Sequence, residues 1–584
     1  MSQGDYLVVG SYLLFLACTG LWFRSLNRTT TDFFAGSRRM TWWLAGADGF
    51  IANFSCWTFV GAAQIAYDHG LVIFGYYLAD IAGFFLGYLW FAARFRQLRL
   101  LTPMDAVRLR FGVATEQFFT ALSLLSGLLV AVVRVVSLTI ILGSAFNLPA
   151  PPIVLMVGLV VICIGLVGGN WALAAANFVQ LVVLMSVTMV VAIIVVWRCG
   201  GPGELAAGIP ARHWTVLHPA GTIPYDWLFV AVGVLGASYA KNSLLAAGKY
   251  LATKDSFHAR RSALVPMLGY AVMPLIWMIP PLAAFRLVPD LPQRSFLTTA
   301  GESSYIAVAM SALPPGMTGL LVVCLLCSTL ANLGQNVNRH AAYLVSNIYR
   351  SLLRPRAPER ELLAAGRAAT VGFTLLIAGL ALAATSLVQV PVFDAFLYIT
   401  AYLGLPITTP LFLVLFHRRA PAWSAWFAAL VGMAVTGVIY AFAPTEPGRA
   451  WLEPMLGAEM FGYVVKNPFV ATNLVAVPLT VLAFWLSAAG KREADREGAE
   501  FYRLLETPVD FEQEVGGDNM AVQARLLGRL TFFAALFLLV LAFLADTALG
   551  RLGLCGCALL PMLVGMGLIR HGRNLDRQAV DQRR

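Results

Sequence analysis

The chain has 584 residues, of which 59% are hydrophobic and only 12% are charged, and its formal net charge is +11. This composition excludes a soluble enzyme and indicates a polytopic membrane protein. It also argues against nucleic acid as a partner, because the arginines and lysines cluster in alternate connectors between apolar runs, as membrane topology requires. The sequence has no catalytic triad, phosphate-binding loop or zinc-ligand spacing, so we expect neither enzyme activity nor a cofactor.

Apolar runs of about 20 residues predict an all-α protein with fifteen membrane-spanning helices. A leading helix covers 6–24. Ten core helices are expected at 42–68, 71–97, 116–147, 151–169, 171–198, 224–250, 262–288, 302–349, 363–387 and 389–416, and four trailing helices at 421–443, 466–488, 529–547 and 551–570. The cations of alternate connectors place the N-terminus outside and the C-terminus in the cytoplasm of a bacterial-type inner membrane.

These spans divide the chain into five parts. Residues 1–41 hold the leading helix and an inside loop, 42–416 the ten-helix core, 417–489 two further helices, 490–528 a cytoplasmic connector, and 529–584 two C-terminal helices and a cytoplasmic tail. The connector contains REGAEFYRLLETPVDFEQEVGGDNM, whose mixed charges predict a short surface helix and a loop.

The first core helix is apolar but carries polar side chains in its middle. Asn53, Ser55 and Thr58 lie among glycines and alanines, and hydrocarbon cannot solvate them. One interpretation is that they join helix to helix. The other is that the flanking Gly46 and Gly61 permit a locally unwound helix, whose freed carbonyls can bind a cation.

Three ionisable residues fall well inside apolar spans: Asp80, Arg134 and Lys241. Each costs about 2.5–3.5 kcal/mol at the centre of a bilayer, so each needs a partner or a water-filled cavity. A structural ion pair, most simply Asp80 with Lys241 or Arg134, is one interpretation. Contact with a charged substrate, or a proton relay, is the other. Two cations against one anion favour an anionic group on a substrate.

The eighth core helix holds a second polar stretch, LLCSTLANLGQNVNRHAAYLVSNIYR. Ser328, Asn332 and Gln335 recur at helical spacing and share one face, and Thr329 and Asn336 add further oxygens. Hard cations are held by oxygens, so this face is suited to complete a sodium shell opposite the first core helix. A polar seam between helices is the alternative.

Five stretches together resemble the sodium/solute symporter family, the group that contains the sodium–galactose and sodium–proline symporters. They are DFFAGSRRMTWWLAGADGFIANFSCWTFVGAAQIAYDHG, IGLVGGNWALAAANFVQ, GKYLATKDSFHARRS, STLAN followed by SNIYR, and LFHRRAPAWSAWFAALVG. They occur in the family's order, between about residues 30 and 440. The resemblance implies two five-helix inverted repeats, with sodium and substrate near the bilayer midplane, and alternating access.

The resemblance also implies site residues. Sodium would bind backbone carbonyls near Ile51 and Phe54, with side-chain oxygens from Ser328 and Thr329 or Asn332. The substrate pocket would be lined by Asn53, Trp57, Thr58, Tyr77, Asp80, Tyr239 and Thr400, to which the intramembrane charge of Lys241 is added.

Two departures from the family pattern bear on these sites. The aspartate of the family's TDxxQ element is here Asn177. In the eighth helix, alignment on STLAN puts the family's hydroxyl pair at Ser328 and Thr329, whereas alignment on SNIY puts it at Ala331 and Asn332.

The pocket expected from these residues is more aromatic than a sugar site, so we expect a small organic acid or amino acid. The predicted function is therefore sodium-coupled symport of a small polar solute across a lipid bilayer, by a monomer or a homodimer. The alternatives are a sodium-independent or proton-coupled carrier that uses Lys241 or Arg134, and a solute sensor that does not transport.

Overall fold

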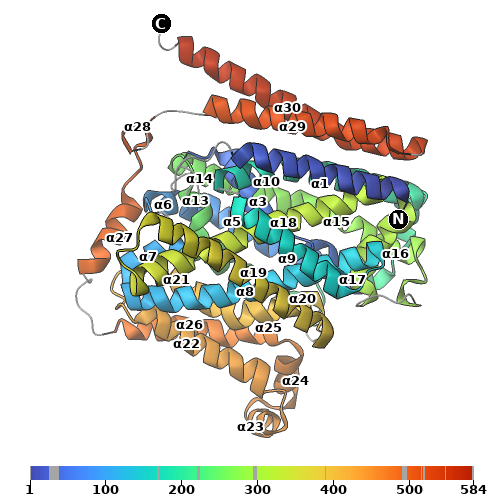
Figure 1. The fold of residues 1–584 in the computed structure, drawn as a ribbon. Helices are drawn as coiled ribbons and strands as arrows, with labels where there is room; N and C mark the ends of the chain where they lie inside the picture. The colour runs from blue at the N-terminus through green and yellow to red at the C-terminus, as the bar shows by residue number, and fades with distance from the viewer. Residues whose placement is uncertain are drawn as a thin grey trace.

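The computed structural model describes residues 2–24, 39–100, 102–167, 170–219, 224–293, 299–387, 390–489, 496–514, 516, 520–545 and 547–581. Within these residues eleven helices are long and apolar enough to cross a membrane, or twelve if one bent pair counts as a span. The leading helix, the broken first core helix and the shorter fourth core helix lie at the remaining predicted positions. The prediction of an all-α polytopic membrane protein is confirmed (Figure 1).

The first half of the core follows α1 (Gln3–Arg24). It consists of α3 (Trp42–Asn53), η2 (Thr58–Ala62) and α4 (Ala63–His69); α5 (Val72–Leu86), η3 (Gly87–Phe91) and α6 (Ala92–Gln97); the short α7 (Pro103–Phe111); α8 (Val113–Phe146); α9 (Ala150–Val167); and α10 (Asn170–Arg198).

The second half follows α11 (Pro202–Gly208) and η4 (Ala211–Trp214). It consists of α12 (Trp227–Asn242), η5 (Leu244–Ala247) and α13 (Gly248–Leu251); α14 (Ser256–Ser262), α15 (Leu264–Trp277) and α16 (Ile279–Leu287); α17 (Ala300–Ala312); α18 (Met317–Tyr343) and η7 (Leu344–Leu353); α19 (Glu359–Leu387); and α20 (Val392–Ile399), η8 (Thr400–Gly404) and α21 (Leu405–Leu413).

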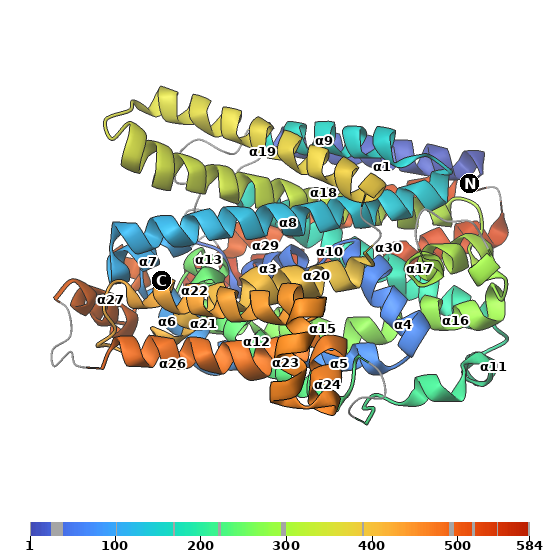
Figure 2. The same ribbon diagram turned by 90° about the horizontal axis from the view of Figure 1, so that it is seen from below.

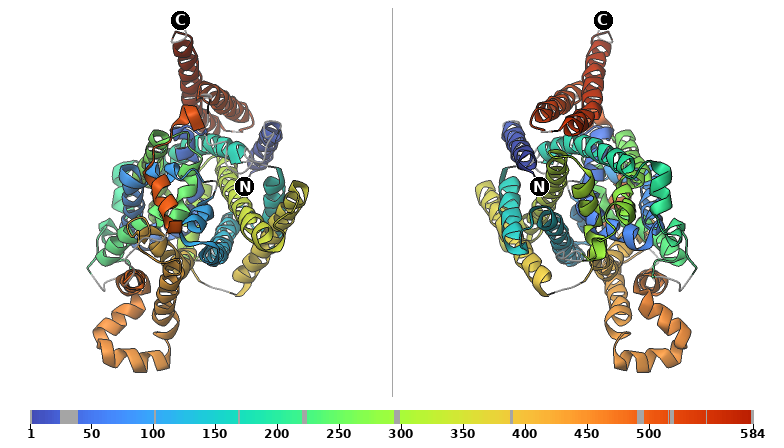
Figure 3. Two further views of the ribbon diagram at one scale, coloured as in Figure 1. Left: turned by 90° about the vertical axis from the view of Figure 1, so that its left-hand side faces the viewer. Right: turned by 90° about the vertical axis from the view of Figure 1, so that its right-hand side faces the viewer.

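The trailing helices are α22 (Ser424–Gly437) with η9 (Val438–Phe442), α25 (Pro468–Ala471) with η10 (Thr472–Ala476) and α26 (Val477–Ser487), α29 (Met520–Ala542) and α30 (Ala548–Asp581). Between the first two lie the short α23 (Glu446–Leu456) and α24 (Ala458–Lys466). Figure 3 shows that the α29–α30 pair and the α22–α24 group project from opposite sides of the core.

The single helix predicted at 302–349 is wrong. The chain makes two helices there, α17 and α18, because Pro314 and Pro315 lack a backbone N–H and Gly316 has a left-handed φ of 88°. The N-terminus of α18 is instead capped by Asp5 of α1, whose carboxylate accepts hydrogen bonds from the N–H groups of Gly316 and Gly319 at 2.8 Å each. The leading helix thereby fixes the start of α18.

Helix α18 lies at the centre of the core. Its most apolar stretch is entirely buried, and α1, α3, α8, α9, α10 and α19 pack around it (Figure 2). The N-terminus lies at the same end of the bundle as α16 and α17, whereas α7 and α27 (Arg496–Glu506) lie at the opposite end (Figures 1 and 2).

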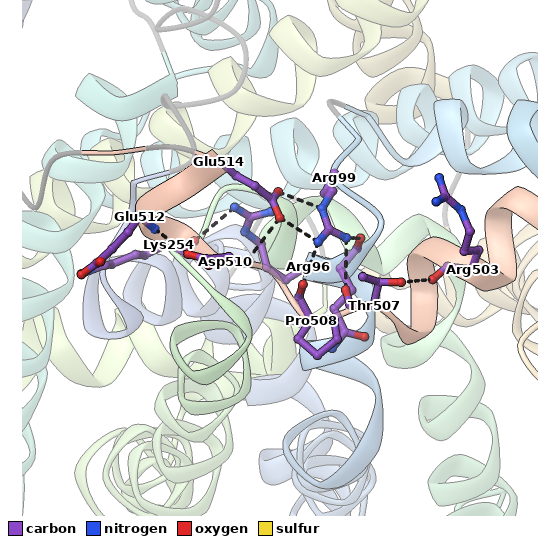
Figure 4. Close-up of polar contacts among 10 residues, drawn as sticks. Arg96, Arg99, Lys254, Arg503, Thr507, Pro508, Asp510, Glu512 and Glu514 are labelled. Carbon is purple, nitrogen blue, oxygen red and sulfur yellow. Dashed lines mark hydrogen bonds and ion pairs between the residues drawn. The ribbon is translucent and has the colours of Figure 1, made fainter.

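The predicted surface helix of the polar connector is α27, and the short α28 (Phe511–Glu514) follows it. Arg99, next to the end of α6, holds this segment (Figure 4). Its guanidinium donates to both carboxylate oxygens of Glu514 at 2.8 and 2.7 Å, and to the carbonyls of Thr507 and Pro508. Bidentate arginine–carboxylate geometry is directional, so the connector is fastened across the ends of α6 and α7.

Candidate functional site

The first core helix is broken at the position expected. α3 ends at Asn53, and Phe54 is extended, with φ −101° and ψ 141°, before helical structure resumes at Thr58. The break leaves backbone carbonyls without their intrahelical partners. In a membrane-spanning segment such groups must be satisfied by neighbouring protein, water or an ion. The side chain of Asn53 itself lies outside the described residues.

The freed carbonyls meet one side chain of α18. Asn332, which is 1% exposed, donates from Nδ2 to the carbonyl oxygens of Ile51 at 3.0 Å, Ala52 at 2.9 Å and Phe54 at 2.7 Å. The Oδ1 atom of Asn332 accepts a hydrogen bond of 2.6 Å from Arg134 of α8. Three helices are therefore joined at the break through one amide.

The hydroxyls of the other two predicted sodium ligands, Ser328 and Thr329, make hydrogen bonds to other groups. Ser328 donates to the carbonyl of Leu325 in its own helix at 3.0 Å. Thr329 accepts a hydrogen bond of 2.9 Å from the backbone N–H of Cys56, just past the break. Of the two alignments left open by the sequence, the one that includes Asn332 puts a polar side chain on the carbonyls.

A small cavity of about 80 Å³ lies beside the break. It is lined by Ser55, Trp57, Thr58, Tyr76, Tyr77, Asp80, Val130, Val133, Arg134, Lys241, Tyr270 and Phe396. Five of the predicted substrate-binding residues are in this lining: Trp57, Thr58, Tyr77, Asp80 and Lys241.

Tyr239 and Thr400, which were also expected to line the pocket, are not in this lining. The Thr400 hydroxyl donates to the carbonyl of Phe396 at 2.9 Å, one turn back in its own helix. The ring of Tyr239 packs against Phe412, with 5.4 Å between ring centroids. Each side chain is taken up by contacts with neighbouring helical residues.

The lining contains two cations and one carboxylate. Lys241 Nζ lies 3.0 Å from Asp80 Oδ1, and the two side chains are 17% and 12% exposed, so one of the two predicted pairings is present. Arg134 binds elsewhere, to Asn332 and to the carbonyl of Ala52 at 3.3 Å. The cavity therefore has an excess of positive charge.

Aromatic rings form one wall of the cavity. Trp57 lies 5.0 Å from Phe396 and 5.5 Å from Tyr76, measured between ring centroids, and Tyr77 stacks on Tyr270 at 5.9 Å. Sequence reasoning missed Tyr76, Tyr270 and Phe396. The spacing of Val130, Val133 and Arg134 on one face of α8 was a readable signal for the opposite wall.

A half-buried carboxylate that the sequence analysis did not single out lies on α3. Asp48 Oδ1 accepts hydrogen bonds of 2.8 Å from the side-chain amides of both Asn177 and Gln335. Asn177 is the residue that the resemblance sets at the place of the TDxxQ aspartate. Here the carboxylate between α3, α10 and α18 comes from α3, and α10 supplies an amide to it.

Comparison with known proteins agrees with this architecture. The profile of the Sodium:solute symporter family matches residues 33–432. Sodium/glucose cotransporter 1 of Oryctolagus cuniculus is 24% identical over 482 residues, which cover 74% of this chain and 71% of that protein. Sodium/sialic acid symporter SiaT of Proteus mirabilis is 24% identical over 508 residues, which cover 83% of this chain and 96% of that protein.

The fold has solved counterparts. The structure of a Na+-coupled sialic acid symporter in its substrate-bound outward-open state superimposes with a TM-score of 0.67 at 18% identity, and the match covers 85% of this chain and 99% of that one. The likeness confirms the predicted five-plus-five core. This chain therefore belongs to the sodium:solute symporter family: it is a multi-pass membrane transporter, not an enzyme, and it couples a small solute to sodium.

Proposed function

We propose that the solute is a small organic acid or amino acid and that its carboxylate binds in the cavity between η2, α5, α8, α12 and α15. The observation that carries this proposal is the charge of the lining, which holds two cations, Arg134 and Lys241, and one carboxylate, that of Asp80. A carboxylate on the solute balances the surplus cation, which a neutral sugar does not.

Two further observations support an acid. The aromatic wall of Trp57, Tyr76 and Phe396 suits the apolar body of a small solute better than a ring of hydroxyl groups. Two relatives, from Proteus mirabilis and Aliivibrio fischeri, are named as symporters of sialic acid.

In this proposal residues 42–416 perform transport, with sodium at the carbonyls of Ile51 and Phe54 and the α18 side chains beside them. The membrane is the plasma membrane, with the N-terminus outside. Support for this orientation comes from the end of the bundle that carries α27, where Arg96, Arg99 and Lys254 gather (Figure 4).

The test is uptake into proteoliposomes under an imposed sodium gradient, with lactate, succinate, proline, N-acetylneuraminate and galactose as labelled solutes. We expect sodium-driven uptake of at least one acid and loss of that uptake in Arg134→Gln. The matched control is Arg198→Gln at the far end of α10, whose guanidinium binds the carbonyl of Ala312. Uptake of galactose alone would contradict the proposal.

A further inference from the structure

The break after α3 forms a nest of three carbonyl oxygens around a single point. The oxygens of Ile51, Ala52 and Phe54 all lie within 3.0 Å of Asn332 Nδ2. An amide NH2 has only two hydrogens to offer to three acceptors. Three oxygens converging on one point are also the surroundings that a hard cation requires. Asn332 thus fills, with an uncharged donor, a place that suits a cation.

Arg134 strengthens this substitute. Its guanidinium donates to Asn332 Oδ1 at 2.6 Å and to the Ala52 carbonyl at 3.3 Å. A charged donor on the amide oxygen polarises the amide and strengthens the hydrogen bonds that its nitrogen donates. Arg134 therefore acts on the carbonyl nest both directly, at Ala52, and through Asn332, and we call these two side chains the relay.

The relay and a sodium ion exclude one another. The amide nitrogen stands 2.7–3.0 Å from each oxygen, which is the place an ion would take. With an ion there, the Asn332 side chain must turn so that Oδ1 rather than Nδ2 faces the ion. The turn presents Nδ2 to Arg134, and because both groups are then donors, their hydrogen bond is lost.

Release of Arg134 has a consequence for the solute, because this side chain already lines the cavity. A guanidinium without its Asn332 partner is a bidentate donor of the geometry that carboxylates accept. Before sodium binds, that donor is occupied; after sodium binds, it is available to an acid.

We propose that Asn332 and Arg134 couple the two ligands: sodium takes the carbonyl nest from Asn332, and Arg134, released from Asn332, binds the carboxylate of the solute. This inference rests on the proposed function, since it needs an acidic solute. Coupling of binding free energies is reciprocal, so the acid also raises the affinity for sodium.

The first arm of the test uses sodium alone. Thermal stability of the purified protein is titrated with NaCl at constant ionic strength against KCl. We expect Arg134→Gln to bind sodium more tightly than the wild type, by about fivefold, because nothing then holds Asn332 on the carbonyls. An unchanged or weaker sodium response in Arg134→Gln would overturn the relay.

The second arm adds lactate, succinate, proline, N-acetylneuraminate and, as a neutral sugar, galactose. In the wild type we expect acid affinity to rise about fivefold or more from KCl to NaCl. In Asn332→Ser, where the amide that engages Arg134 is gone, we expect acid affinity to be the same in both salts. The matched control is Asn338→Ser, the same change on the same helix, which should keep the wild-type salt dependence.

The two arms separate the failure of this inference from failure of the proposed function. Acid binding that is equal in NaCl and KCl for the wild type overturns the coupling and leaves the acidic solute intact. Binding of galactose with no response to any acid overturns the proposed function, whereas the sodium arm still reports whether Arg134 holds Asn332 in place.

Discussion

The break after α3 and the break after α12 both follow an asparagine. α3 ends at Asn53 and α12 at Asn242, and in each case the next residue, Phe54 or Ser243, is extended. The two helices hold corresponding places in the two halves of the core. The groups that close the two breaks are different.

At the first break, the neutral amide of Asn332 from another helix, α18, donates to the freed carbonyls. At the second break, an ion pair lies beside the break. There Asn242 donates to the carbonyls of Gly83 at 2.9 Å and Ser238 at 3.0 Å, and the adjacent Lys241 pairs with Asp80. A neutral donor can move off the carbonyls without leaving an unpaired charge behind, so a cation can take its place. An ion pair cannot be replaced in this way, because the displaced charge is left buried. The first break is thus suited to exchange ligands, and the second to fasten α12 to α5.

The largest loss of stability should come from breaking the Asp80–Lys241 ion pair at the second break. Lys241→Gln leaves the Asp80 carboxylate buried without this cation, and breaking such a pair costs about 3–5 kcal/mol. Unfolding in detergent micelles measures the loss. The double change Asp80→Asn with Lys241→Gln should be milder than the sum of the single changes. If the double variant lost as much stability as the two single variants together, Asp80 and Lys241 would not be coupled.

Removing Asn332 at the first break should lower the stability of the protein by less than Lys241→Gln does. Sodium should restore part of that stability. Asn332→Ala removes one donor from three carbonyls. Ile51 keeps the N–H of Phe54 and Ala52 keeps Arg134, so the cost falls mainly on the Phe54 carbonyl and should be about 1–3 kcal/mol. Because a cation can take the vacated place, NaCl should stabilise this variant more than it stabilises the wild type.

Asn242→Ala is the matched control for Asn332→Ala, since it removes the same side chain at the second break. It should lose stability in NaCl and KCl alike. If NaCl stabilised both variants equally, the proposed difference between the two breaks would be wrong.

A smaller effect is expected at the second contact between α3 and α18, that of Asp48 with Gln335. Asp48→Asn removes the charge from two hydrogen bonds and should cost about 1.5 kcal/mol. Adding Asn177→Asp returns a carboxylate to the same place from α10, so the exchanged pair should recover stability. A double variant less stable than Asp48→Asn would show that the direction of this contact matters.

The smallest effect is expected for Ser328→Ala. The Ser328 hydroxyl donates to its own helix, so its loss should cost at most about 1 kcal/mol and leave the sodium titration unchanged. A weakened sodium response in this variant would show that Ser328 binds the ion, as the STLAN alignment implies, and not Asn332.

Much of the fold could be predicted from the sequence, because membrane-spanning helices are recognised as long apolar runs. The polar residues and glycines of the first core helix gave its break as one of two interpretations. The cost of intramembrane charge predicted a partner for Asp80, either Lys241 or Arg134, and the structure has Lys241. The error at 302–349 arose because residues on both sides of Pro314 are apolar, so length and hydropathy alone did not show two helices.

The rest of the site depends on which helices touch, which periodicity within one helix does not reveal. Nothing local to Asn332 shows that its amide meets three carbonyls some 280 positions earlier in the chain. Asp48 was overlooked for the same reason, since its partners come from α10 and α18. Tyr239 and Thr400 have the expected chemistry, but their contacts lie with neighbouring residues and not in the cavity.

The most direct test of the account is an experimental structure of the protein with sodium and an acid that it transports. We predict an ion at the carbonyls of Ile51 and Phe54. The amide of Asn332 is rotated so that Oδ1, and not Nδ2, faces the ion, and the Arg134 guanidinium binds the solute carboxylate. A structure with the acid bound and Arg134 still within hydrogen-bonding distance of Asn332 would contradict it.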